Sequence, residues 1–245
     1  KNLKLEKMIN IYEIFEKPLI KILAFMEMGG IEVDSKFLNL LSTKFEKKIK
    51  NLEKEVFKIS KKEFNIASPK QLGEIIYNDL KITGLKKTKK GSFATSASVL
   101  EDLAFKGHKF PQLVLDWRQV SKLKNTYSDS LPEHVNPMTK RVHTSFLLAA
   151  TTTGRLASSD PNLQNIPIKS EDGKDIRKAF TAKKGHLLIS ADYNQIEMRI
   201  LADLADVKEL KKAFKNNEDI HSLTASQIFN IDIKKVDQDH RRKAK

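Results

Sequence analysis

The stretch Leu187–Leu201 constrains the fold most strongly. Its first half is an apolar run that includes the β-branched Ile189 and has no helix start signal, which predicts a buried strand. Its second half places Ile196, Ile200 and Leu204 at i, i+4 and i+8, the spacing of an amphipathic helix. The chain is therefore expected to contain a strand that leads directly into a helix.

Asp192 lies at the junction between this strand and this helix. A carboxylate at the end of a buried strand needs a cation, a hydrogen-bond donor or water, because burying it without a partner is costly. Its hard oxygen atoms suit Mg²⁺. The alternative is that Asp192 simply caps the helix that follows. Spacing alone slightly favours the helix cap.

Helical patterns fill the first half of the chain. Residues 35–62 are rich in Lys and Glu and carry an apolar stripe with a period near 3.5, formed by Phe37, Leu38, Leu41, Phe45, Ile49, Leu52, Val56 and Ile59. Residues 110–131 are also helical in pattern, and Asp34 and Ser68 are each placed to cap the helix that follows them. An antiparallel return of the second helix along the first would complete an elongated helical subdomain.

Basic and hydroxyl residues gather in and near this helical region. Residues 83–96 are dense in Gly, Lys, Ser and Thr, which makes a phosphate-binding loop and a disordered basic loop about equally plausible. Lys122 and Lys124 are expected to be exposed and able to contact phosphate. The net charge of +14 favours an anionic partner such as nucleic acid, although lysine-rich composition and solvation explain it as well.

The pattern changes after Leu131-Pro132. Residues 141–150 read as a strand, and residues 151–165 are polar and irregular. The irregular stretch is dense in Asn, Gln, Thr, Ser and Arg, whose side chains can bind base edges, sugar and phosphate. A long polar loop within a compact chain is usually functional or disordered.

Shorter helices are expected towards the C-terminus. Residues 207–214 form one, and Asp219 caps another that has His221 in its first turn, where a lone histidine is most often a surface residue. Arg241 and Lys245 are four residues apart on one helical face. Two cations there repel unless an anion binds between them; the alternative is a solvated end.

Several classes of protein are excluded or disfavoured. The sequence has no cysteine, so disulfides and thiolate metal sites are excluded. No apolar run is long enough to span a bilayer, and no secretory signal pattern begins the chain. Neither end resembles a natural terminus, so we expect a fragment of a longer protein.

Two long motifs in this order resemble those of family A DNA polymerases, the bacterial DNA polymerase I group. Asp192–Arg199 is similar to the family motif D-Y-S-Q-I-E-L-R, with Asn194 for Ser and Met198 for Leu. Residues 153–167 resemble T-G-R-L-S-S-x-D-P-N-L-Q-N-I-P. Shorter matches occur at residues 123–132, 219–221 and 241–245, so the resemblance covers essentially the whole chain.

The resemblance implies an α+β fold, a fragment of a right-hand polymerase with antiparallel sheet in its palm. The implied segments are palm-associated helices at 1–34, a helical thumb at 35–130 with a basic tip loop at 83–96, part of the palm at 131–204, and the start of the fingers at 205–245. The implied partners are primer-template DNA and a dNTP, with no membrane and no evident obligate protein partner.

The resemblance also implies a two-metal Mg²⁺ site for nucleotidyl transfer. Asp192 would be the catalytic carboxylate that binds metal, and the Tyr193 carbonyl would add a second oxygen ligand. The family's second carboxylate, on a later palm hairpin, has no counterpart in this sequence. We therefore expect the chain alone not to polymerise.

Further roles carry over residue by residue. Glu197 would block a ribose 2′-hydroxyl, and the other nucleotide-binding residues would be Gln195, His221, Arg241 and Lys245. Arg155 would reach the primer-terminal minor groove, and Asn162, Gln164 and Asn165 would contact template and primer. The thumb would contact the duplex backbone through Thr95, Ser96, Lys122 and Lys124.

Three hypotheses follow. The leading one is part of a DNA polymerase that acts in replication or repair. A non-catalytic DNA-binding module shares the basic surface but has no need of Asp192 beside Glu197. A relative of single-subunit RNA polymerases shares the palm aspartate, but the large Glu197 disfavours it. A bacterial source would imply a cytoplasmic, nucleoid-associated enzyme, and an organellar source is the alternative.

Overall fold

The structure is a computed structural model that describes residues 2–82, 93–168, 170–237, 240–241 and 244. It contains two units, Lys1–Leu188 and Ile189–Lys245, each of which is described by itself. Most of the predicted basic loop, residues 83–92, and the predicted phosphate ligand Lys245 lie outside the described residues. The unit boundary falls inside the segment predicted as palm, and the predicted division into four segments stays a prediction.

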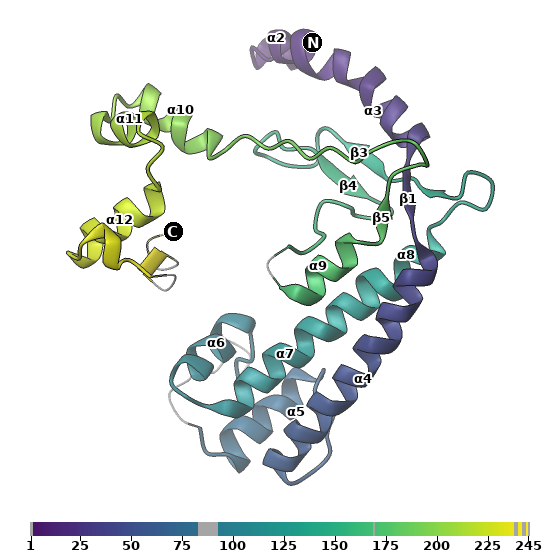
Figure 1. The fold of residues 1–245 in the computed structure, drawn as a ribbon, viewed down its shortest axis with the longest axis vertical. Coiled ribbons are helices and arrows are strands. Elements are labelled where there is room, and N and C mark those ends of the chain that lie inside the picture. Colours follow the sequence, from purple (N-terminus) through teal and green to yellow (C-terminus); the bar gives the residue numbers. More distant parts are fainter. Residues whose placement is uncertain (1, 83–92, 169, 238–239, 242–243, 245) are drawn as a thin grey trace. The chain divides into compact units, whose positions relative to one another are not determined.

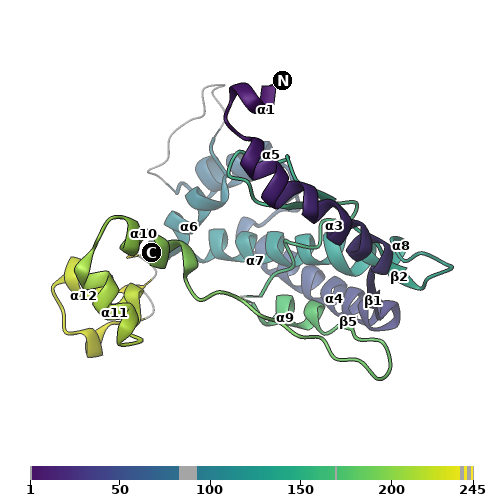
Figure 2. The same ribbon diagram turned by 90° about the horizontal axis from the view of Figure 1, so that it is seen from above.

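A long helical hairpin dominates the first unit. Helix α4 (Ser35–Ser60) and helix α7 (Lys109–Leu123) lie side by side in both views (Figures 1 and 2). They run antiparallel, because Trp117 contacts Glu53 whereas Asp129, beyond the end of α7, contacts Ser42. The predicted antiparallel return is thus confirmed.

Local capping explains where α4 begins. The carboxylate of Asp34 accepts a hydrogen bond from the Phe37 amide at 2.9 Å, as predicted. The apolar stripe of α4 faces inward, and Leu38, Phe45 and Val56 on it are fully buried. The helix therefore forms because its cap and its buried stripe agree.

Shorter helices pack at the end of the hairpin where α4 ends and α7 begins. These are α5 (Pro69–Glu74), the π-type turn η2 (Ile75–Asp79) and α6 (Ala97–Phe105). Ser68 caps α5 by accepting from the Gln71 amide, as predicted. A separate apolar core holds these helices to α4 and α7; its fully buried members include Val56, Leu72, Ile76, Leu100 and Val114.

Two small antiparallel sheets lie at the base of the hairpin. In one, strand β1 (Ile31–Val33) lies between β2 (Arg141–Val142) and β5 (Phe180–Thr181). In the other, β3 (Ser145–Leu147) pairs with β4 (Ala157–Ser159). The single strand predicted for residues 141–150 is therefore two shorter strands, and part of the predicted irregular stretch is a strand. The α+β class is confirmed.

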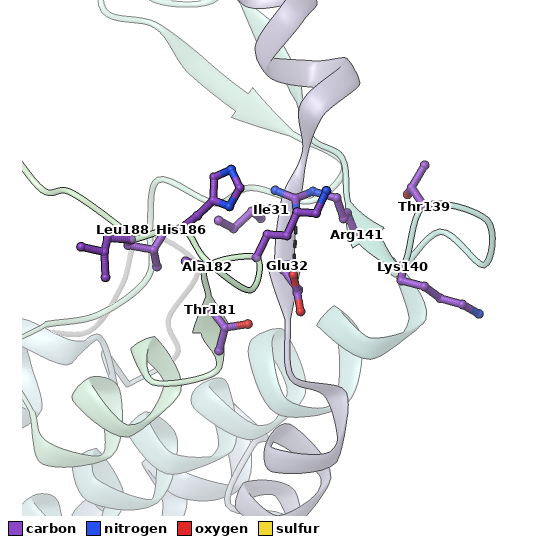
Figure 3. A pocket seen from close by; sticks show the side chains of 11 residues that line it. Ile31, Glu32, Thr139, Lys140, Arg141, Thr181, Ala182, His186 and Leu188 are labelled. Carbon is purple, nitrogen blue, oxygen red and sulfur yellow. Dashed lines mark ion pairs between the residues drawn. The ribbon is translucent and has the colours of Figure 1, made fainter.

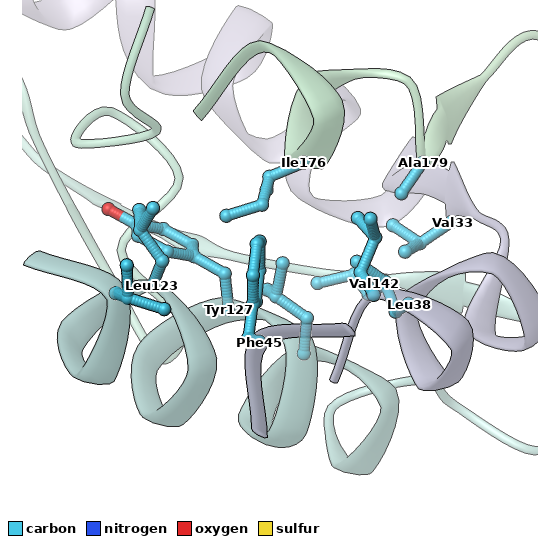
Figure 4. Packing of buried hydrophobic residues seen from close by; sticks show 11 residues of the cluster. Val33, Leu38, Phe45, Leu123, Tyr127, Val142, Ile176 and Ala179 are labelled. Atoms are coloured by element: carbon cyan, nitrogen blue, oxygen red, sulfur yellow. The ribbon is translucent and has the colours of Figure 1, made fainter. Parts of the chain in front are cut away.

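The core at the base joins the helices to the sheet. Figure 4 shows Phe45 of α4, Tyr127, and Ile176 of α9 (Glu171–Arg177) converging, with Val33 and Val142 of the strands nearby. Ion pairs from α4 to α9, between Lys44 and Asp175 and between Lys48 and Asp172, reinforce this packing at the surface.

The remaining elements of the first unit complete the connections. A series of helices precedes β1 in the chain, and a π-type segment and a short helix connect α7 to β2. The elements are α1 (Asn2–Leu5), α2 (Ile9–Ile11), η1 (Tyr12–Glu16), α3 (Lys17–Gly29), η3 (Lys124–Asp129) and α8 (Ser130–Glu133). Within the described residues, no helix is both long enough and apolar enough to cross a bilayer.

The second unit is helical. It contains α10 (Ile196–Leu204), α11 (Lys208–Lys215), α12 (Ile220–Phe229) and the short η4 (Ile233–Lys235). The Arg199 guanidinium lies 4.5 Å from the centroid of the Phe214 ring, which fastens α10 to α11. The helices predicted after Leu187–Leu201 are confirmed.

The predicted buried strand before Asp192 is wrong. Residues 186–195 carry no strand, and Leu187 and Ile189 are 88% and 90% exposed. A strand requires a hydrogen-bonded neighbour, and no described residue pairs with this run. Its apolar composition is real, but the burial that the composition predicts is absent from this structure.

Candidate functional site

The polar loop that carries the predicted DNA contacts is well defined. Residues 160–165 follow β4, and Asn162, Gln164 and Asn165 are exposed. The Asn162 side chain accepts from the Gln164 amide at 3.0 Å, and the Tyr127 hydroxyl donates to the Asn165 carbonyl. The backbone of the loop is thus held while its amide side chains face outward. Arg155, ahead of β4, is also exposed.

A groove of about 600 Å³ lies between this loop and α7. Gln164 and Asn165 line one side, and Gln119 and Lys122 line the other. Amide groups that can donate and accept therefore face an ammonium group across one hollow. This combination suits a ligand with both base-edge acceptors and phosphate charge.

A second groove, of about 610 Å³, continues along the helical hairpin. Its lining includes Thr95, Ser96, Lys122 and Asn125. Lys122 lies on both grooves, so five of the residues predicted to bind DNA share one continuous surface. Thr95 itself is buried, and its carbonyl accepts from Arg118 at 2.7 Å, whereas Ser96 and Lys122 are exposed.

The expectation that Lys124 is exposed is wrong. Its side chain is 18% exposed and pairs with Asp129 at 2.8 Å and with Glu46 at 3.5 Å. The π-type segment η3 explains this, because such a turn brings residues five apart together. The hydrogen bond that Lys124 donates to the Asp129 carboxylate is the main cause of the raised pKa of Lys124. The positive charge of Lys124 is therefore already compensated by acidic side chains within the protein, whereas the Lys122 side chain is exposed.

In the second unit, Asp192 does not cap a helix. Helix α10 begins at Ile196, and the residue ahead of it is Gln195, in a left-handed conformation at φ 52°. Asp192 and Tyr193 lie on the irregular stretch before it, and both are exposed. Glu197 falls in the first turn of α10. The capping alternative for Asp192 is thereby excluded.

Asp219 connects the residues predicted to hold the triphosphate. It accepts from the His221 amide at 3.2 Å and the Ser222 hydroxyl at 2.7 Å, and it pairs with Arg241 at 2.7 Å. Its cap on α12 was predicted, but its pairing with Arg241 was not. A hollow of about 220 Å³ beside Asp219 is lined by Gln195 and Arg199 as well.

These contacts set the protonation of Asp219. Partial burial raises its pKa, but hydrogen bonds from Arg241 and Ser222, the charge of Arg241 and the His221 amide outweigh that effect. The pKa falls from 3.8 to about 2. Asp219 therefore stays ionised and holds the Arg241 guanidinium in place.

The residues available for a metal ion are few. Within the described ranges, no group of three or more His, Asp or Glu side chains is arranged to hold one. Asp192 and the Tyr193 carbonyl nevertheless provide exposed, hard oxygen donors. Mg²⁺ is often bound through one or two carboxylates together with water and substrate phosphates. The donor set fits part of such a site.

Another cleft, of about 630 Å³, lies beside β1 (Figure 3). It is lined by Glu32, Arg141 and His186 among others, and Arg141 pairs with Glu32 at 3.8 Å. Figure 3 shows Leu188 at its rim, next to His186. No residue predicted to be functional lines it.

Comparison with solved structures places this fold among polymerase domains. A structure described as the POL domain of Pol1 from M. smegmatis in complex with DNA primer-template and dNTP is similar, with a TM-score of 0.87. The two are 38% identical, and the match covers 99% of this chain and 42% of that one. The model of the family described as DNA polymerase family A matches residues 35–245, so the chain belongs to that family.

Curated relatives agree. The chain is 50% identical to a DNA polymerase I from Rhizobium leguminosarum over 96% of its own length and 23% of that protein. It is 48% identical to a DNA polymerase I from Caldicellulosiruptor bescii over 96% of its length and 27% of that protein. The chain thus spans about a quarter of the relatives it matches.

Some residues that shape these sites were missed in the sequence. Tyr127 was assigned only to a motif, and the buried hydroxyls of Thr144 and Ser158 were not singled out. Their partners lie 38 and 14 residues away, so no local pattern marks them.

Proposed function

We propose that this chain contributes the DNA-binding arm, part of the catalytic palm and the start of the nucleotide site of a DNA-directed DNA polymerase. The reaction is attack of a primer 3′-hydroxyl on the α-phosphorus of a dNTP. The observation that carries the proposal is the continuous surface through Lys122, which joins Ser96 to the amide side chains of Gln164 and Asn165.

That surface suits primer-template DNA in two ways. Lys122 and Ser96 supply phosphate contacts, which position a duplex without selecting a sequence. Gln164, Asn165 and Arg155 supply donors for the minor groove, where every base pair presents acceptors. Binding should therefore be independent of sequence and should weaken steeply with salt, because released counterions drive it.

The chemistry rests on the junction before α10. Asp192 and the Tyr193 carbonyl would hold Mg²⁺, which when bound neutralises charge on the reacting phosphate. Glu197 would exclude a ribose 2′-hydroxyl, and Gln195 would line the same nucleotide site. His221, Arg241 and Lys245 would hold the triphosphate. The Arg241 guanidinium suits this role because it can bind two phosphate oxygens at once. Participation in replication or repair, and a cytoplasmic location, belong to this proposal.

Equilibrium binding of a primed duplex to the chain tests the DNA-binding part. We expect affinity to fall steeply between low and physiological salt, and Gln164→Ala with Asn165→Ala to weaken binding further. Affinity that is flat with salt would contradict the proposal. In a polymerase that contains this chain, Glu197→Ala should ease ribonucleotide incorporation. Unchanged discrimination between ribonucleotides and deoxyribonucleotides would count against the role of Glu197 in excluding the ribose 2′-hydroxyl.

A non-catalytic DNA-binding module is the second candidate, because the basic surface alone supports it. It is distinguished by Asp192, which a binding module has no reason to expose beside Glu197. We expect the chain by itself not to extend primers. Extension by the isolated chain that Asp192→Ala abolishes would overturn that expectation.

A further inference from the structure

Two buried hydroxyl groups lie directly beneath the DNA-contacting loop. Ser158 is 3% exposed and Thr144 is 7% exposed, and their hydroxyl oxygens are 2.6 Å apart. Thr144 Oγ1 also lies 2.8 Å from the Pro161 carbonyl, and Ser158 Oγ lies 3.1 Å from the Leu163 amide. Both hydroxyls therefore contact the backbone of the loop that follows β4.

Both hydroxyls have backbone partners in the loop that follows β4 or at the end of β4 itself. Each hydroxyl has one proton to donate. The Leu163 amide donates to Ser158, one of the two hydroxyls donates to the other, and the remaining hydroxyl proton goes to a backbone carbonyl, that of Pro161 from either hydroxyl or that of Ser159 from Thr144. These bonds tie both hydroxyls to the backbone of residues 159–163. Such chains strengthen their members and leave no buried group unpaired.

The same loop is held at its other end. The Tyr127 hydroxyl donates to the Asn165 carbonyl, and Arg177 donates to the carbonyls of Ile166 and Pro167 at 3.0 and 3.1 Å. These contacts take up backbone groups only. The side chains of Gln164 and Asn165 remain exposed on the groove that Lys122 also lines.

We propose that the Thr144–Ser158 hydroxyl pair is a positioning device that presets Gln164 and Asn165 for primer-template DNA. The proposal rests on the proposed DNA-binding function of the loop. A loop that is already ordered loses less conformational entropy on binding. Neither hydroxyl touches DNA; each acts through the amide side chains that the loop presents.

Thr144→Val tests this, because it keeps the shape of the side chain and removes its hydroxyl. We expect affinity for a primed duplex to fall about tenfold, the effect of losing a buried hydrogen bond. The slope of affinity against salt should not change, because the phosphate contacts stay. Amide exchange at Leu163 should accelerate, and Thr144→Ser should restore both affinity and exchange protection.

Two controls separate positioning from general stability. Ser60 is another buried hydroxyl, which donates to the Lys62 carbonyl at 2.7 Å near the far end of α4, so Ser60→Ala is a matched loss of a bond. It should lower the melting temperature without changing DNA affinity. In a Gln164→Ala, Asn165→Ala background, Thr144→Val should cause no further loss.

The outcomes distinguish the two proposals. If Gln164→Ala and Asn165→Ala leave binding unchanged, the proposed function of the loop fails, and the positioning role fails with it. If they weaken binding but Thr144→Val does not, only the positioning role is overturned. The positioning role would also be overturned if Ser60→Ala lowered DNA affinity as much as Thr144→Val does. A further loss of DNA affinity on adding Thr144→Val to the Gln164→Ala, Asn165→Ala background would overturn it as well. Should Thr144→Val not fold, Ser158→Ala tests the same chain of bonds.

Discussion

The ion pair between Asp219 and Arg241 makes the most specific prediction about the second unit. It joins the cap of α12 to a residue predicted to hold the triphosphate. The pKa of Asp219 is lowered from 3.8 to about 2. A fall of this size corresponds to about 2–3 kcal/mol of stabilisation, at about 1.4 kcal/mol for each pKa unit.

That figure must be reduced for solvent. The Asp219 and Arg241 side chains are 38% and 37% exposed, so water screens the interaction and about 1 kcal/mol remains. Because the folded pKa is below the unfolded one, the stabilisation is complete well above pH 3.8 and is lost as pH falls through about 2.

Two variants test this. Asp219→Asn keeps a good helix cap and removes the charge, so it should lower the free energy of unfolding by about 1 kcal/mol at neutral pH. Arg241→Gln should raise the pKa of the Asp219 carboxyl towards 3.8, which a ¹³C NMR titration of the carboxyl measures. An Asp219 midpoint near 3.8 in the wild type, or one unchanged by Arg241→Gln, would refute the reasoning.

Three further predictions concern the first unit. Phe45→Ala should lower the free energy of unfolding by about 3–5 kcal/mol, because Phe45 is fully buried. Leu40→Ala, on the exposed face of the same helix, should change the free energy of unfolding by less than about 0.5 kcal/mol. Denaturant titration of both variants tests this difference. Lys122→Gln should reduce the salt slope of DNA binding by about 1, whereas Lys124→Gln, which removes an internal ion pair, should leave the slope nearly unchanged. Asp34→Ala should lower the free energy of unfolding by about 1 kcal/mol, because it removes the cap of α4. Unfolding followed by circular dichroism measures this change, and an unchanged free energy of unfolding would contradict the prediction.

The features that the sequence predicted well are local ones. The caps at Asp34, Ser68 and Asp219 each depend on residues within three positions of them. The antiparallel hairpin of α4 and α7 follows from two apolar stripes that must bury each other. The residues predicted to bind DNA at Ser96, Lys122, Gln164 and Asn165 line two grooves that share Lys122, and their role in binding stays a prediction.

The features that the sequence could not predict depend on strand pairing, backbone geometry or contacts that no local pattern marks. The apolar run at Leu187 has strand composition, but a strand forms only where another strand pairs with it. Lys124 has the composition of a surface cation, and only the π-type turn places it against Asp129. The hydroxyl pair joins Thr144, just before β3, to Ser158 of β4, and neither residue carries a sequence signal of this contact.

The catalytic role of Asp192 is the central claim of this account. It is tested most directly by single-turnover primer extension with a polymerase that contains these 245 residues and the rest of a family A polymerase domain. We expect Asp192→Asn to abolish nucleotide incorporation while leaving the affinity for primed DNA within about twofold, because the carboxylate acts on the metal and not on the duplex. Incorporation by Asp192→Asn at the wild-type rate would contradict the account.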